Sequence, residues 1–83
     1  MTETETVTVC AEYTDTFGGE ANYSWVDRAE ITVPAGASER TITRRVKAAL
    51  GLTGMRGRSY WCGDLWEFRP YGCATVAFAT VQY

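Results

Sequence analysis

The chain has 83 residues, with ten acidic and eight basic side chains and a formal charge of −2. This length predicts a single small domain over residues 1–83. The hydrophobic fraction of 46%, with three Trp, five Tyr and three Phe, excludes a disordered composition. The small net charge excludes a chain that acts as a whole as a polyanion mimic or a nucleic-acid polycation.

Residues 6–14, "TVTVCAEYT", alternate between apolar and polar side chains, which predicts a half-buried strand. Its odd-numbered residues are expected to face inward. A second strand is predicted at residues 24–33, ended by Pro34. Its expected inward residues are Trp25, Ala29, Ile31 and Val33, with Trp25 in the core. Asp27 interrupts this alternation, so we expect a β-bulge there.

The segment "DTFGGEAN" joins these two strands and is interpreted as the connection of a β-hairpin. Gly18 and Gly19 can supply the positive φ angles that such turns need. Because the connection is longer than two residues, we expect it to project. Phe17 then either packs back over the sheet edge or stands free at the tip, and we expect the second.

The segment that starts at Pro34 predicts a helix of about 13 residues, with Ser38 as its N-cap and Gly51 at its end. One face is expected to pack on the sheet, namely Ile42, Val46, Ala49 and Leu50. Arg40, Arg44 and Lys47 are expected on the opposite face, exposed to water.

The remaining segment, "RSYWCGDLWEFRPYGCATVAFATVQY", predicts three more strands separated by Gly63-Asp64 and by Pro70-Tyr71-Gly72. Trp66 and Phe68 share one face of a strand, and Ala74, Val76 and Phe78 share one face of the next. The predicted order is ββαβββ. This is an α+β fold in which one helix packs on one face of an antiparallel sheet of four to five strands.

The composition lacks the side chain that enzymes use most often as a catalytic base. The chain has no His, and its single lysine, Lys47, is expected on the exposed helix face rather than in a site where it could act as a base. Cys10, Cys62 and Cys73 show no CxxC spacing, so we expect reduced, buried thiols and no zinc site. The sequence therefore predicts a protein that is not an enzyme and has no cofactor or metal.

The N-terminal segment "MTETETVTV" has neither a positive region nor an apolar region of the kind found in secretory signals. No window approaches 18 apolar residues. We therefore expect a cytoplasmic protein that has no membrane partner.

Two surfaces are candidate binding sites. The first is the hairpin tip with Phe17, Glu20 and Tyr23, because exposed aromatic rings often anchor protein interfaces. The second is basic and would bind nucleic acid or an acidic partner; it comprises Arg40, Arg44, Arg45, Lys47, Arg56 and Arg58. Tyr60 and Trp61 follow these cations and would add stacking, although a pI near 5.0 disfavours a dedicated nucleic-acid binder.

The segments "YTDTFGGEANYSWV" and "RRVKAALGLTGMRGR" resemble small proteins encoded by bacteriophages and prophages. Accessory proteins of this class include anti-CRISPR proteins, many of which cover a surface of a host complex. The resemblance implies a non-enzymatic phage or mobile-element protein that works inside a bacterial host cell. Its partner would be a host protein or ribonucleoprotein complex.

Two other functions remain open from the sequence. One is a small nucleic-acid-binding or transcription-associated module that uses the basic helix and the loop after it. The other is a structural subunit of a virion or homo-oligomer such as a homodimer, for which the C-terminal strand ending at Tyr83 would offer a sheet edge.

Overall fold

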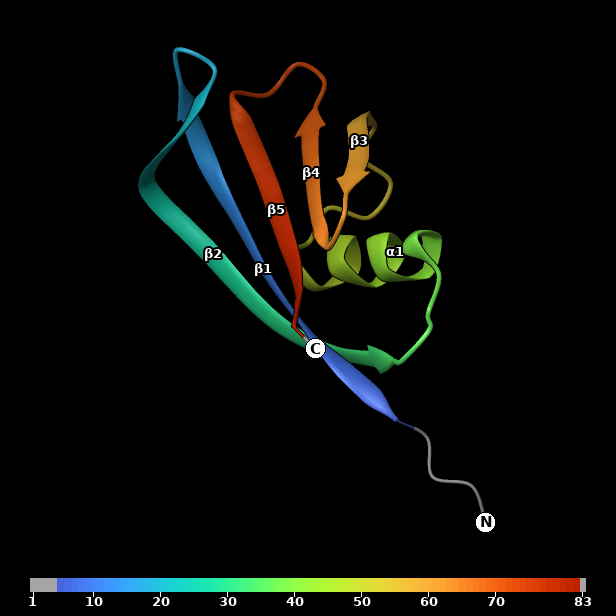
Figure 1. Cartoon of the computed structure of the whole chain (residues 1–83). Coiled ribbons are helices and arrows are strands. Elements are labelled where there is room, and N and C mark those ends of the chain that lie inside the picture. Colours follow the sequence, from blue (N-terminus) through green and yellow to red (C-terminus); the bar gives the residue numbers. More distant parts are fainter. Residues whose placement is uncertain (1–4, 83) are drawn as a thin grey trace.

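A computed structural model describes residues 5–82, and Figure 1 shows their arrangement. The described elements are β1 (Thr6–Phe17), β2 (Glu20–Pro34), α1 (Glu39–Ala49), β3 (Gly57–Cys62), β4 (Leu65–Pro70) and β5 (Thr75–Gln82). The predicted order ββαβββ and the α+β class are confirmed.

The five strands form one sheet in the order β2-β1-β5-β4-β3, and all neighbouring strands are antiparallel. The edges of the sheet are therefore β2 and β3. The expectation that the C-terminal strand offers an edge is wrong, because β5 lies between β1 and β4 and pairs with both. Tyr83 itself lies outside the described residues.

The turn of the β1-β2 hairpin is shorter than its sequence predicted. It consists of Gly18 and Gly19, whose φ angles of 63° and 86° are both positive, as in a type I′ turn. β1 continues to Phe17 and β2 begins at Glu20, so most of the predicted connection is strand.

The predicted bulge at Asp27 is also wrong, since Asp27 pairs regularly with Tyr13. The register shifts farther along, where Thr14 pairs with Val26 but Thr16 pairs with Ala21. The four residues 22–25 of β2 thus lie opposite a single residue of β1, Asp15. This is a β-bulge, in which β2 carries three more residues than β1 (four against one).

Local chemistry explains both ends of α1. The Ser38 hydroxyl accepts a hydrogen bond from the backbone N–H of Thr41 at 3.1 Å, which confirms the predicted N-cap. At the other end, Gly51 has a φ of 76° and the backbone N–H of Leu52 donates to the Lys47 carbonyl at 2.7 Å. This is a Schellman motif, and the predicted stop at Gly51 is confirmed.

The buried face of α1 differs from the predicted one by a rotation about the helix axis. Ile42, Val46 and Leu50 are buried as expected, but Ala49 is exposed. Lys47, expected in water, is half-buried and reaches toward β4. The reason is that β3 and the loop before it pack against the Thr43 and Lys47 side of the helix, which leaves the Ala49 side uncovered.

The core is built from large rings on β4 and small residues on β5. Trp66 and Phe68 are 0% and 1% exposed and stack with ring centroids 5.6 Å apart. Their cross-strand neighbours on β5 are Ala79 and Ala77, which leave room for the rings under the helix. Val76 and Phe78 share the opposite face of β5, as their alternation predicted.

The second face of the sheet carries no helix within residues 5–82, as Figure 1 shows. The alternation of side chains places Cys10 and Cys62 on this face, and Cys73 lies in the β4-β5 loop. All three thiols are free and exposed. The expectation that they are buried is wrong because a single helix covers only one side.

Trp25 is not part of the core, contrary to the sequence-based expectation. It is 42% exposed and packs edge to face against Tyr13, with the ring centroids 5.3 Å apart. It belongs to the bulge of β2, and α1 lies away from the hairpin end of the sheet (Figure 1). The Trp25 ring therefore packs against the Tyr13 ring and is not surrounded by core side chains on all sides.

We expect Trp66→Ala to cost about 3–5 kcal/mol of unfolding free energy, a large part of what so small a domain has. Trp25→Ala should cost about 1–2 kcal/mol, because its ring is partly in water already. Urea denaturation followed by circular dichroism measures both. Equal losses would contradict this account of the core.

Candidate functional site

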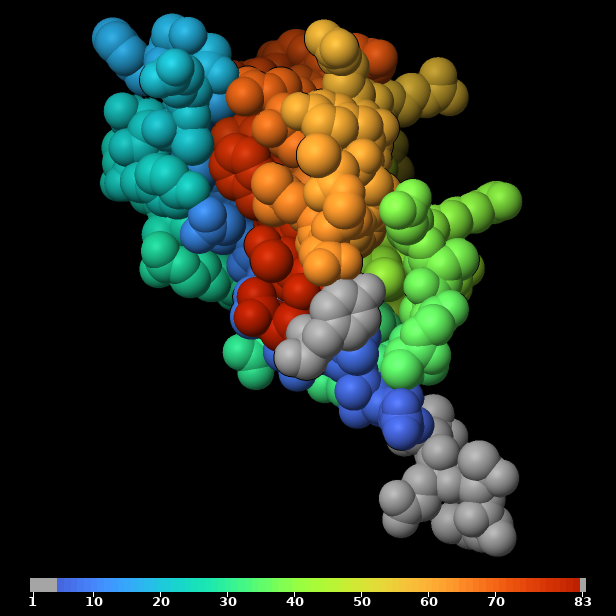
Figure 2. Space-filling view, in the orientation of Figure 1, coloured from blue at the N-terminus to red at the C-terminus, as the bar shows by residue number. Residues whose placement is uncertain are grey.

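The tip of the β1-β2 hairpin presents a large apolar side chain to solvent. Phe17 is 80% exposed and pairs across the turn with Glu20, which is also exposed. The hairpin end appears in cyan at the upper left of Figure 2, apart from the green helix on the right. Arg69 of β4 donates from Nη1 to the Gly19 carbonyl at 2.7 Å, which ties the turn to the body of the sheet.

The bulge below the tip is organised by Thr14, a fully buried polar side chain. Its hydroxyl oxygen accepts the backbone N–H of Tyr23 at 3.1 Å and lies 2.8 Å from the Trp25 carbonyl, to which it donates. Tyr23 has a φ of 56°, a conformation that non-glycine residues rarely adopt. The buried hydroxyl thus holds a strained backbone segment in place.

Asp15, the residue of β1 that follows Thr14, completes the network. Its carboxylate accepts hydrogen bonds from the Ser24 hydroxyl, from the Ser24 backbone N–H at 3.0 Å and from the Asn22 side chain at 2.9 Å. These bonds, those of the Ser24 and Asn22 side chains above all, hold the pKa of Asp15 well below its usual range. The ionised form of Asp15 therefore stabilises the bulge.

Tyr23, predicted to join Phe17 in one surface, is directed elsewhere. Its hydroxyl donates to Glu12 at 2.6 Å, and this bond raises the pKa of Tyr23. Glu12 lies five residues before Phe17 in β1, on the face without a helix. Of the three predicted hairpin residues, the structure brings Phe17 and Glu20 together and turns the Tyr23 side chain away from the tip.

On the face of the sheet that carries no helix within residues 5–82, one row of cross-strand neighbours combines charged and aromatic side chains. From β2 to β3 the row is Arg28, Glu12, Phe78, Glu67 and Tyr60. Glu12 lies 3.6 Å from Arg28, and Glu67 lies 2.9 Å from Arg69. A hydrogen bond to Glu67 raises the pKa of Tyr60. Both carboxylates of this row, Glu12 and Glu67, are therefore paired with neighbours of the same chain.

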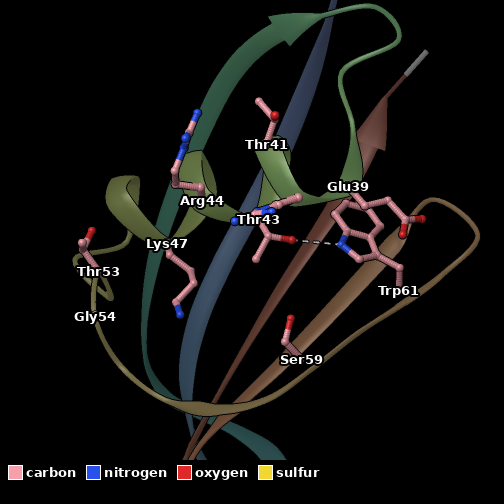
Figure 3. Close-up of a pocket in the computed structure, with 10 residues that line it drawn as sticks. Glu39, Thr41, Thr43, Arg44, Lys47, Thr53, Gly54, Ser59 and Trp61 are labelled. Carbon is pink, nitrogen blue, oxygen red and sulfur yellow. Dashed lines mark hydrogen bonds between the residues drawn. The ribbon is translucent and has the colours of Figure 1, made fainter.

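The helix side carries a cleft of about 640 Å³ between α1 and β3 (Figure 3). Its lining consists of Glu39, Arg40, Thr41, Thr43, Arg44, Lys47, Thr53, Gly54, Ser59 and Trp61. The volume lies in the range typical of small-molecule sites, roughly 300–1,000 Å³. We call this hollow the α1-β3 cleft.

Three polar groups in the α1-β3 cleft are positioned by the surrounding fold. Lys47 donates to the Met55 carbonyl at 2.7 Å, and its ammonium lies 4.5 Å from the centroid of the Phe68 ring. The Thr43 hydroxyl accepts the indole N–H of Trp61 at 3.0 Å. The Ser59 hydroxyl accepts the indole N–H of Trp66 at 2.7 Å. A hydrogen bond to another segment of the chain thus fixes the position of each of these three groups.

The six predicted basic residues do not form one surface. Arg40, Arg44 and Lys47 line the cleft, whereas Arg45, Arg56 and Arg58 do not. Arg58 alternates with Ser59 on β3 and so lies on the opposite face of the sheet, together with Tyr60. Of the two rings expected beside the cations, Trp61 alone is in the cleft.

The hydroxyl groups of the cleft, Thr43 and Ser59, were not among the predicted site residues, which were charged or aromatic. A signal was present in the helix, because Arg40, Thr43 and Lys47 follow one another at spacings of three and four residues and share one face. Ser59 gave no such signal. Its place depends on the packing of β3 beside β4, which brings Ser59 to the buried Trp66.

No family model matches the chain, and comparison with curated proteins and with solved structures finds no significant similarity. Within residues 5–82, no helix has the length and apolar character needed to cross a membrane. The same part of the chain contains no group of three or more His, Cys, Asp or Glu side chains that could hold a metal ion.

The lowered pKa of Asp15 predicts a dependence of stability on pH. The stabilisation from its carboxylate is fully present above the unfolded pKa of about 3.9 and is lost as the pH falls through the lower folded value. Asp15→Asn should therefore lower the urea midpoint at pH 7, and the difference from wild type should shrink progressively as the pH falls below about 4. Asp27→Asn, at an exposed carboxylate, serves as the control. A difference that is constant with pH would contradict this role of Asp15.

Proposed function

We propose that the protein is a non-enzymatic accessory protein of a phage or another mobile element, and that it acts by protein–protein contact. Its partner is a host protein or ribonucleoprotein complex, and inhibition of such a complex, as by an anti-CRISPR protein, is the activity we assign. The resemblance of the hairpin and helix segments to phage proteins supports the origin. The geometry of the hairpin supports the mode of action.

The observation that carries this proposal is the 80% exposure of Phe17 at a turn with a well-supported backbone. An exposed ring on a loose loop loses conformational entropy when it binds, whereas a ring on a preorganised turn loses less. Here the turn is supported by Arg69, and the strands below it are supported by Thr14 and Asp15. Phe17 has the properties of an interface anchor.

The other two functions receive less support from the arrangement of the chain. A nucleic-acid module would use one continuous basic surface, but the cations are divided between the two faces of the sheet. A virion or homo-oligomer subunit would use the C-terminal strand as a sheet edge, but β5 is interior. A protein contact through the hairpin tip requires neither a continuous basic surface nor an exposed C-terminal strand.

Phe17→Ala tests the proposal. Because the ring is exposed, the melting temperature should stay within a few degrees of wild type. Binding to the partner should weaken by about 2 kcal/mol or more if the ring is an anchor. The partner is first identified by capture with the wild-type protein from bacterial host lysates, and its affinity is then measured with purified components.

Tyr71→Ala provides the matched control. Tyr71 is 66% exposed in the β4-β5 loop, so its loss also removes an exposed ring but leaves the hairpin intact. It should bind the partner as wild type does. A Phe17→Ala protein that folds normally and binds its partner with unchanged affinity would refute the role of the hairpin tip.

A further inference from the structure

We propose that the α1-β3 cleft is a binding site for a small phosphorylated ligand, a phosphate monoester. The site lies in the helix layer and is separate from the hairpin tip, so this inference does not depend on the proposed protein contact. Three features of the cleft lead to it: a positioned ammonium group, two hydroxyls whose protons are free, and two further guanidinium groups in the lining.

The ammonium group of Lys47 is held in place before any ligand arrives. One of its three protons goes to the Met55 carbonyl, and the Phe68 ring lies beneath it at 4.5 Å. Two protons remain for an acceptor in the cleft. Figure 3 shows the Lys47 side chain directed into the gap between α1 and the segment that carries Ser59.

The two hydroxyls are oriented by the bonds they accept. Thr43 takes the Trp61 indole proton and Ser59 takes the Trp66 indole proton, so each oxygen acts toward the protein as an acceptor. Within residues 5–82 neither hydroxyl donates to a protein acceptor at hydrogen-bond distance. Each therefore has its own proton available for an anion. A phosphate group offers the several acceptor oxygens that such a set of donors requires.

The charge distribution favours a small ligand over a nucleic acid strand. Arg40 and Arg44 add positive charge to the lining, and Glu39 is the single carboxylate there. Figure 3 places Glu39 on the far side of the Trp61 ring from Lys47, away from the donors. The whole chain, in contrast, carries a formal charge of −2, which repels a long polyanion but leaves a local phosphate site intact.

The test is an NMR titration of the ¹⁵N-labelled protein at constant ionic strength, with AMP, inorganic phosphate, adenosine and an oligothymidylate as probes. AMP and inorganic phosphate should both shift the Trp61 indole signal and the amide signals of Thr43 and Ser59, whereas adenosine should not. Comparison of AMP with inorganic phosphate shows whether the organic part of the ligand contributes. Phe17→Ala should bind AMP as wild type does.

Two variants locate the site, and a third is their control. Arg40→Gln and Thr43→Val should each weaken AMP binding about tenfold, since each removes a donor to a charged group. Arg45→Gln changes the charge of the same helix equally but lies outside the cleft, so it should bind AMP within about twofold of wild type.

Several results would overturn the inference. They are the absence of any shift with AMP and inorganic phosphate, equal shifts with adenosine and AMP, and equal losses in Arg40→Gln and Arg45→Gln. Binding of the oligothymidylate without binding of AMP would likewise replace the small ligand by a nucleic acid strand.

Discussion

The structure depends on one constraint, which is that a single helix of 11 residues must bury one face of a five-stranded sheet. The helix contributes a narrow apolar stripe of Ile42, Val46 and Leu50, so the sheet has to supply most of the core volume itself. It does so with Trp66 and Phe68, which fit because β5 places alanines beside them. Among residues 5–82 no helix covers the other face, and there charged and aromatic side chains pair across strands.

The short helix also accounts for the α1-β3 cleft, because α1 and β3 meet only in part. β3 is a short edge strand, and both it and the loop before it pack against one side of the helix, where Trp61 bonds to Thr43 and Lys47 bonds to Met55. The contact is made through side chains rather than by close packing of the two elements. A hollow lined by polar groups is left between them, and its donors are held by the bonds that close the fold.

At the hairpin end of the sheet, hydrogen bonds rather than apolar packing hold the backbone of the bulge in place. β2 has four residues where β1 has one, and Thr14 and Asp15 satisfy the backbone and side chains of this surplus. The bulge allows the strands to regain register before the Gly18-Gly19 turn. Phe17 therefore stands at the end of a regular hairpin and not in a long loop.

Local signals in the sequence determined the elements: the alternation of residues 6–14, the Ser38 cap, the Gly51 stop and the three C-terminal strands all appear where they were predicted. These features depend on neighbouring residues, and a sequence displays neighbours directly. The tertiary structure decided the exposure of Trp25 and of the three cysteines, the partial burial of Lys47 and the interior place of β5. It also decided that Thr43 and Ser59 line the same cleft. Each of them depends on which face the one helix covers and on which side β3 packs, and these are contacts between segments distant in the chain.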